Sequence, residues 1–268
     1  MDTRRTAARW LRGPPMSSLR AWLELTRISN LPTVVSNVIA GAVLGGICVD
    51  HSAWEATAQL FVPSLLWLGL CIPCIVYIAG MILNDACDAR IDTKERAARP
   101  IPSGRVSRGL AFVTGFTLLA AAVGLAFLTH DHDVVNATIA LVSIVLIYDF
   151  LHAAHWSTVI FLALARAHAS LIPMLAYAQD ASDHIFERPV ILLPIALAAW
   201  TLALSVLARG EVSATRAFAR PHAIGWMIAC IPLVDMIAML FAAAWGPASL
   251  CLSLLILTRL GQRRIEAS

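Results

Sequence analysis

A succession of long apolar segments constrains this chain more than any other feature of its sequence. Most of them reach the ~20 residues that a helix needs to cross a hydrocarbon core. Lipid cannot satisfy backbone polar groups, and these runs do not alternate with period two, so we expect helices and no barrel. The eight segments are 31–49, 60–83, 109–129, 134–150, 157–178, 189–208, 222–244 and 246–258.

Composition agrees with a membrane protein. Of the 268 residues, 59% are hydrophobic and 14% are charged, whereas soluble domains carry about 25% charged residues. The predicted fold is therefore all-α, a polytopic transmembrane bundle of about eight helices. Such a chain is an integral, multi-pass protein of the lipid bilayer, and we expect no nucleic-acid partner.

The basic residues predict the orientation of the bundle. With eight helices, 18 of the 20 Lys and Arg residues fall on one side, and the opposite loops hold only Arg188. By the positive-inside rule, both termini and the charged segment after the second helix lie in the cytoplasm, at the inner membrane if the protein is bacterial. An odd number of helices would put the Arg-rich tail on the wrong side.

That charged segment, "LNDACDARIDTKERAARPIPSGR", begins at Leu83, where the second apolar segment ends. Asp85, Asp88 and Asp92 follow one another at spacings of three and four residues, with Asn84 four residues before Asp88. On a helix these groups would stack on one face. Three carboxylates repel one another unless a cation lies among them.

Carboxylate oxygens suit Mg²⁺, which typically binds a few carboxylates together with substrate phosphates. The basic residues that follow could meet the remaining phosphate charge. We therefore predict a Mg²⁺–diphosphate site at the cytoplasmic mouth of the bundle. The alternative is a solvated loop of mixed charge.

Two ionisable residues lie inside apolar segments, Arg166 and Asp235. Charges there are costly and usually face the bundle interior or a watery cavity. We therefore expect Arg166 to face the bundle interior or such a cavity, and Asp235 to be its partner or an interior polar group. For Asn37, in the first segment, a packing role is favoured.

Four stretches of the sequence resemble those of a known protein family. "NDACDARID" fits the N-D-x-x-D-x-x-x-D motif of the UbiA superfamily of intramembrane prenyltransferases, and "ERAARPIPSGRVS" is similar to the run that follows it in many members. "LELTRISNLPTVVSNVIAG" looks like the first helix of such proteins, and "LIYDFLH" falls where members carry a Tyr-containing loop. The resemblance covers most of the chain.

The resemblance implies a helical bundle, usually of nine transmembrane helices, around a central cavity open sideways to lipid. It implies Mg²⁺-dependent transfer of a prenyl group from an isoprenoid diphosphate to an aromatic or lipid-like acceptor. It divides the chain into a basic cytoplasmic segment (1–29), a prenyltransferase domain (30–260) and a cytoplasmic tail (261–268).

Residue roles follow from the same resemblance. Asn84, Asp85, Asp88 and Asp92 would hold Mg²⁺, and the three aspartates would be catalytic. The implied contacts to the substrate diphosphate are Arg27, Arg96, Arg99, Arg105, Tyr148, Arg166 and Arg209.

The chain also departs from the family pattern. The loop that usually holds a second acidic motif reads "LARGEVSATRAFARPH", whose one acid, Glu211, is the remaining candidate metal ligand. Arg209, Arg216 and Arg220 could replace the positive charge of a second metal. After Tyr148 come Asp149, His152 and His155, where members often have Lys or Arg. The alternative function is a membrane protein that binds isoprenoids or lipids without transferring them.

Overall fold

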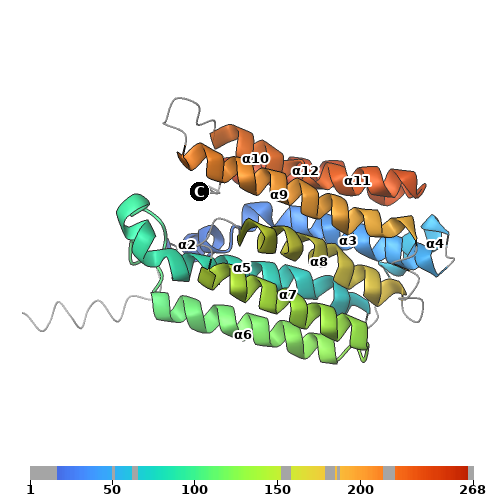
Figure 1. Ribbon diagram of the computed structural model, residues 1–268, viewed down its shortest axis with the longest axis horizontal. Helices are drawn as coiled ribbons and strands as arrows, with labels where there is room; N and C mark the ends of the chain where they lie inside the picture. Colours follow the sequence, from blue (N-terminus) through green and yellow to red (C-terminus); the bar gives the residue numbers. More distant parts are fainter. Residues whose placement is uncertain are drawn as a thin grey trace, which may run out of the picture.

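The computed structural model describes residues 17–49, 52–61, 66–151, 158–178, 185, 188–213 and 221–264. Every regular element in this part of the chain is a helix, and the long helices lie side by side along one direction (Figure 1). The helices, with two short 3₁₀ turns, are α2 Ser17–Leu25, η1 Ile28–Asn30, α3 Leu31–Cys48, α4 Ala53–Gln59, α5 Leu66–Glu95, α6 Arg108–Phe127, α7 His132–Leu151, α8 Val159–Ala178, η4 Pro189–Ile191, α9 Leu192–Ser213, α10 Pro221–Ala229, α11 Ile231–Phe241 and α12 Trp245–Arg264.

Within the described residues, seven stretches are long and apolar enough to cross a membrane. They correspond to the first seven expected segments, with α10 and α11 together forming the seventh. The eighth expected segment lies within α12, a 20-residue helix that is not among the seven. Its last turns carry Arg259, Gln262, Arg263 and Arg264, which lower its apolarity. The all-α transmembrane bundle is confirmed.

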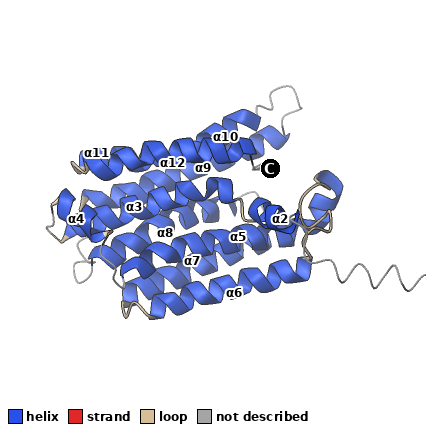
Figure 2. Cartoon of the chain, turned by 180° about the vertical axis from the view of Figure 1, so that it is seen from behind, coloured by secondary structure: helices blue, strands red, loops and turns tan. Residues whose placement is uncertain are grey.

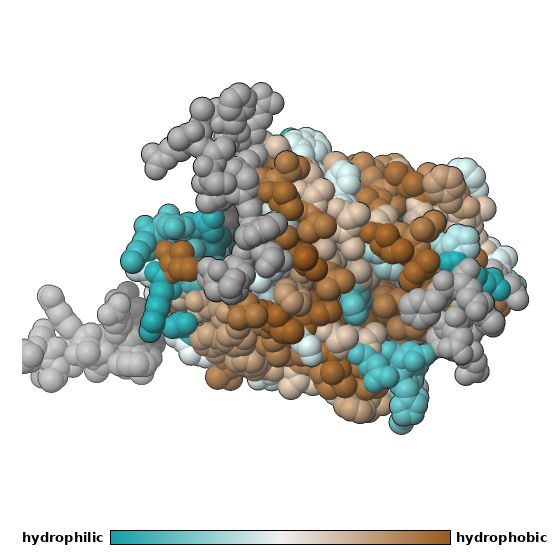
Figure 3. All heavy atoms as spheres, viewed as in Figure 1, coloured by the Kyte–Doolittle hydropathy of each residue, from teal (hydrophilic) through white to brown (hydrophobic). Residues whose placement is uncertain are grey.

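The surface has the distribution that a bilayer requires. Apolar side chains cover the flank of the bundle, and hydrophilic side chains gather toward its two ends (Figure 3). The end with α2, the turn after α5 and the C-terminal end of α12 holds most of the described basic residues (Figure 2). The one-sided charge distribution predicted from sequence is thus present in the fold.

Small residues let α3 and α8 pack closely against each other. A Cβ atom on Gly41 of α3 would lie 2.2 Å from the backbone oxygen of Ser170 on α8, and one on Gly45 would lie 2.2 Å from that of Met174. The two backbones therefore touch, as small residues allow in membrane helices. This contact sets α3 directly against the part of α8 that carries Arg166.

Only the first part of the charged segment, up to Glu95, is helical, and the residues from Arg96 to Arg105 form a turn. α5 continues to Glu95, about three turns beyond Leu83. Ala86 and Ala89 on this extension are buried against Ala21 and Leu25 of α2. Because α2 covers this apolar strip, the helix continues past the end of its membrane-spanning part.

Candidate functional site

The last three turns of α5 present a column of polar groups at one end of the bundle. Asn84, Asp85 and Asp92 are buried, with Asp92 only 2% exposed, and Asp88 is half-buried. The helix thus places four oxygen-bearing side chains along one strip, as their spacing predicted. Buried carboxylates require nearby positive charge.

Two arginines from other segments supply that charge. Arg27 Nη2 lies 3.3 Å from Asp85 Oδ1. Arg99 Nη1 lies 2.7 Å from Asp92 Oδ2 and 3.5 Å from Asp85 Oδ1. One guanidinium nitrogen therefore reaches both carboxylates, and Arg99 is itself buried.

Arg27 is held at a sharp bend between α2 and η1. Its backbone is left-handed, with φ at 46°, a conformation that costs a non-glycine residue about 1–3 kcal/mol and persists only where its surroundings impose it. Tyr77 Oη on α5 donates a hydrogen bond of 3.2 Å to the Arg27 carbonyl. Gln262 Nε2 on α12 donates one of 3.0 Å to Asn30 Oδ1, just past the bend.

Other basic residues near the column make different contacts. Arg105 pairs with Glu24 of α2 at 2.7 Å and donates to the Ala98 carbonyl at 2.8 Å. It therefore ties the turn after α5 to α2. Arg96 is half-exposed and lies 3.8 Å from Asp92.

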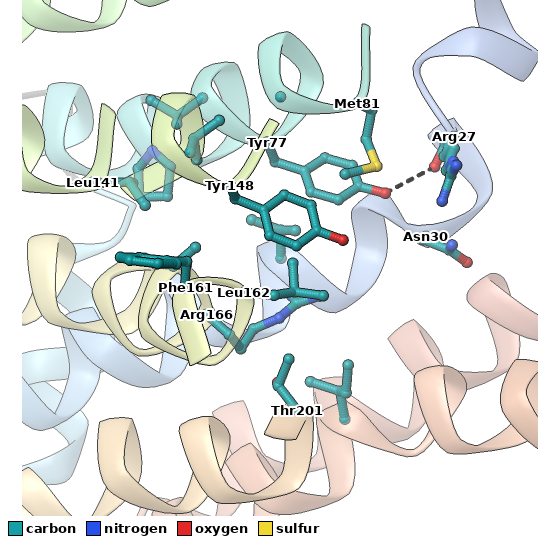
Figure 4. A pocket seen from close by; sticks show the side chains of 18 of the residues that line it. Arg27, Asn30, Tyr77, Met81, Leu141, Tyr148, Phe161, Leu162, Arg166 and Thr201 are labelled. Carbon is teal, nitrogen blue, oxygen red and sulfur yellow. Dashed lines mark hydrogen bonds between the residues drawn. The ribbon is translucent and has the colours of Figure 1, made fainter. Parts of the chain in front are cut away.

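A pocket of about 190 Å³ opens below the column, between α3, α5, α7, α8, α9 and α11. Its lining is mostly apolar, with a small set of polar groups. Arg27, Tyr77, Tyr148 and Arg166 are among them (Figure 4). Asp149 also lines the pocket and accepts a hydrogen bond of 3.4 Å from Asn84, so the pocket and the column are continuous.

A second set of polar side chains forms a hydrogen-bonded network across the bundle, next to the pocket. Arg166 Nη1 donates to Asn37 Oδ1 at 2.9 Å and to Thr33 Oγ1 at 3.3 Å. Asn37 Nδ2 donates in turn to Asp235 Oδ2 at 2.8 Å, and Ser36 Oγ donates to the same oxygen at 2.5 Å. This network links α8, α3 and α11.

Comparison with known proteins decides the family. The model of the UbiA prenyltransferase family matches residues 40–260, which is most of the chain. The chain belongs to the UbiA prenyltransferase family.

Individual relatives match this UbiA-family chain over shorter stretches. Digeranylgeranylglyceryl phosphate synthase of Sulfolobus acidocaldarius is 28% identical over 133 residues, covering 50% of this chain and 43% of the relative. The enzyme of the same name from Methanopyrus kandleri is 33% identical over 108 residues, covering 40% and 35%. The chain thus matches less than half of the length of these relatives.

A solved structure shares the fold. It is described as digeranylgeranylglyceryl phosphate synthase in membranes and superposes with a TM-score of 0.53 at 13% sequence identity. The superposition covers 93% of this chain and 99% of the other. At that identity the likeness concerns the fold alone.

The family implies Mg²⁺, and the donor chemistry of the column fits it. Within the described residues, no group of three His, Cys, Asp or Glu side chains comes together closely enough to hold a metal ion. Asp85 and Asp92 nevertheless approach one guanidinium nitrogen, so their oxygens face a common space. These residues fit a cation that binds together with phosphate oxygens and water, which is how Mg²⁺ usually binds.

The site predictions have different outcomes in this UbiA-family fold. Asn84, Asp85, Asp92, Arg27 and Arg99 come together, and Tyr148 and Arg166 line the adjoining pocket. Their functional roles stay predictions, as do the domain boundaries. Sequence reasoning gave Asn37 a packing role and missed its bond to Arg166. A polar residue in an apolar helix was the available signal.

Some predictions lie outside the described residues. Arg209 and Glu211 belong to the last turns of α9, but their side chains are not described. Arg216, Arg220, His152 and His155 are outside the described ranges entirely.

Proposed function

We propose that this protein transfers a prenyl group from an isoprenoid diphosphate to an acceptor inside the membrane, with Mg²⁺ as cofactor. One observation carries the proposal: two buried carboxylates and two arginines meet at the mouth of an apolar pocket. Charges of both signs suit a metal–diphosphate head group, and the pocket suits its isoprenoid tail.

The arginines and carboxylates have separate roles in this proposal. Arg27 and Arg99 bind the diphosphate oxygens, with Arg96 at the exposed rim. Asn84, Asp85, Asp88 and Asp92 would hold Mg²⁺, which would supply positive charge against the leaving diphosphate.

Transfer begins when the bond between the allylic carbon and the diphosphate oxygen breaks. The electron pair leaves with diphosphate, and the arginines stabilise the charge that grows there. The apolar lining keeps water from the allylic cation, and the rings of Tyr77 and Tyr148 offer it π faces. The acceptor then bonds to that carbon and releases a proton.

The side of the membrane on which the site opens and the identity of the substrates are part of the same proposal. The basic end of the bundle supports a cytoplasmic site mouth under the positive-inside rule. The names of the relatives contain geranylgeranyl and glyceryl phosphate, so geranylgeranyl diphosphate is the first donor to test. The acceptor is hydrophobic or aromatic, and nothing in the described residues points to a particular protein partner.

A second candidate function is binding without transfer. The feature that favours it is the stretch from the last turns of α9 to the start of α10, where "LARGEVSATRAFARPH" lacks the aspartates of the usual second motif. Such a protein would bind the isoprenoid diphosphate and leave its C–O bond intact.

Binding and turnover can be measured separately on the full chain in nanodiscs. Geranyl, farnesyl and geranylgeranyl diphosphates are titrated with Mg²⁺ and then with EDTA, and inorganic diphosphate release is followed with candidate acceptors. We expect one donor to bind at least tenfold more weakly in EDTA, and Asp85→Asn to lose this Mg²⁺ dependence. Asp133→Asn, at the opposite end of the bundle, is the control.

Binding without diphosphate release for any acceptor would favour the second function. Equal donor binding by the wild type and Asp85→Asn, with and without Mg²⁺, would overturn the assignment of the column.

A further inference from the structure

Arg166 is a positive charge inside a membrane-spanning helix with an unusual set of partners. It lines the pocket from α8, and its two hydrogen bonds, both from Nη1, go to the neutral oxygens of Thr33 and Asn37. In the described part of the chain no carboxylate forms an ion pair with it. A charge in this environment is costly unless it is compensated, and it commonly marks a substrate site.

The nearest compensating charge is one side chain further away. Asp235 is fully buried and reaches Arg166 only through Asn37, whose Oδ1 accepts from Arg166 while its Nδ2 donates to Asp235. Within the described residues Asp235 Oδ1 has no hydrogen-bond partner. Asn37 therefore orients the guanidinium, and Asp235 holds the Asn37 side chain in place. No carboxylate of the described residues contacts the guanidinium directly.

Arg166 lies deeper in the bundle than the diphosphate mouth. Its partners Thr33 and Asn37 are two and six residues into α3, which is about 3 Å and about 9 Å along the helix axis. Arg27 precedes the same helix at the mouth, and both arginines line one pocket. The pocket thus carries two cations at different depths, which suits two anionic groups on two different molecules.

We propose that Arg166 binds an anionic group of the acceptor, a carboxylate or a phosphate, and that Asn37 and Asp235 position its guanidinium for this contact. The proposal rests on the proposed function, because it assigns the second substrate of the same pocket. It makes the acceptor an acidic amphiphile whose apolar or aromatic body lies in the pocket. It also gives Arg166 a role different from the diphosphate contact that the family resemblance suggested.

The test measures acceptor binding while the donor site is filled with an inert donor. The full chain in nanodiscs is saturated with Mg²⁺ and geranylgeranyl thiolodiphosphate. Three radiolabelled probes of matched chain length are then titrated: hexadecylglyceryl phosphate, hexadecanoic acid and the neutral hexadecylglycerol. Binding to empty nanodiscs is subtracted. The same titrations are repeated without the donor analogue.

We expect the wild type to prefer one anionic probe over the neutral one by at least tenfold, and the better anion identifies phosphate or carboxylate as the ligand. Arg166→Gln should abolish this preference and leave donor affinity within twofold. Arg166→Lys should retain part of it, because the charge is kept. Asp88→Ala should weaken donor binding and leave the preference intact.

Equal binding of the neutral and anionic probes by the wild type would overturn the proposal. So would an Arg166→Gln variant that loses donor affinity as strongly as probe affinity, because Arg166 would then belong to the diphosphate site. A clear anion preference in a protein that binds no donor would support the Arg166 site and overturn the transferase function.

Discussion

Arg99 donates a 2.7 Å hydrogen bond to Asp92, seven residues before it in the chain. The turn after α5 therefore folds back and brings its own cation to the carboxylates of the helix that it follows. The same nitrogen lies 3.5 Å from Asp85, so one side chain contacts both the first and the last aspartate of the acidic column.

Replacing Arg99 with Gln should reduce prenyl transfer about 10²-fold or more, the cost typical of losing one preorganised charge-stabilising donor. Transfer is measured as diphosphate release with donor and acceptor in nanodiscs. Arg90→Gln is a matched control, because Arg90 is exposed on the same helix, and it should stay within twofold. Equal loss in both variants would mean that general surface charge, and not the position of Arg99, matters.

Gln262→Ala should weaken donor binding several-fold with little change in thermal stability. The change removes the hydrogen bond from α12 to Asn30 and loosens the bend that carries Arg27. Donor titration and a thermal unfolding scan on the same sample separate the two effects. Arg263→Gln, one residue further and exposed, should change neither. Unaltered donor affinity in Gln262→Ala would show that α5 alone holds the bend.

Gly41→Ala should destabilise the protein by about 1–3 kcal/mol, the usual cost of overpacking. The new Cβ atom would meet the backbone oxygen of Ser170 at 2.2 Å, so α3 and α8 must separate. Gly124→Ala is the matched control, since no atom lies within 4 Å of its added Cβ. Ala also favours a helix over Gly by about 1 kcal/mol, so the control should be neutral or slightly more stable. Both are compared by thermal unfolding in one detergent.

Asp235→Ala should also destabilise the protein, by about 3–5 kcal/mol if the loss resembles that of one partner in a buried ion pair. The change leaves Ser36 and Asn37 without their shared acceptor and Arg166 without its compensating charge. Thermal unfolding measures the effect against Asp133→Ala, an exposed residue in the first turn of α7 whose replacement should cost no more than about 1 kcal/mol. A small effect at Asp235 would mean that the network adds little to stability.

Much of the architecture could be predicted because lipid imposes strict rules. Long apolar segments must be helices in a membrane, and seven of the eight predicted segments correspond to spans in the described residues. The acidic column could be predicted as well, since spacings of three and four residues align side chains on any helix, and Asp85 and Asp92 do share a partner. Local periodicity is enough for such statements.

Contacts between segments that are distant in the sequence could be identified only in the tertiary structure. The helical membrane bundle, the acidic column and the one-sided distribution of basic residues could be predicted without them, because each follows from the lipid solvent or from the helical repeat. Only the fold decided that Arg99 serves the column while Arg105 binds Glu24, although both lie in one basic run. Only the fold joined Arg166 to Asn37, 129 residues apart. Such pairings depend on how helices pack, and the close approach of α3 and α8 at Gly41 sets that packing here.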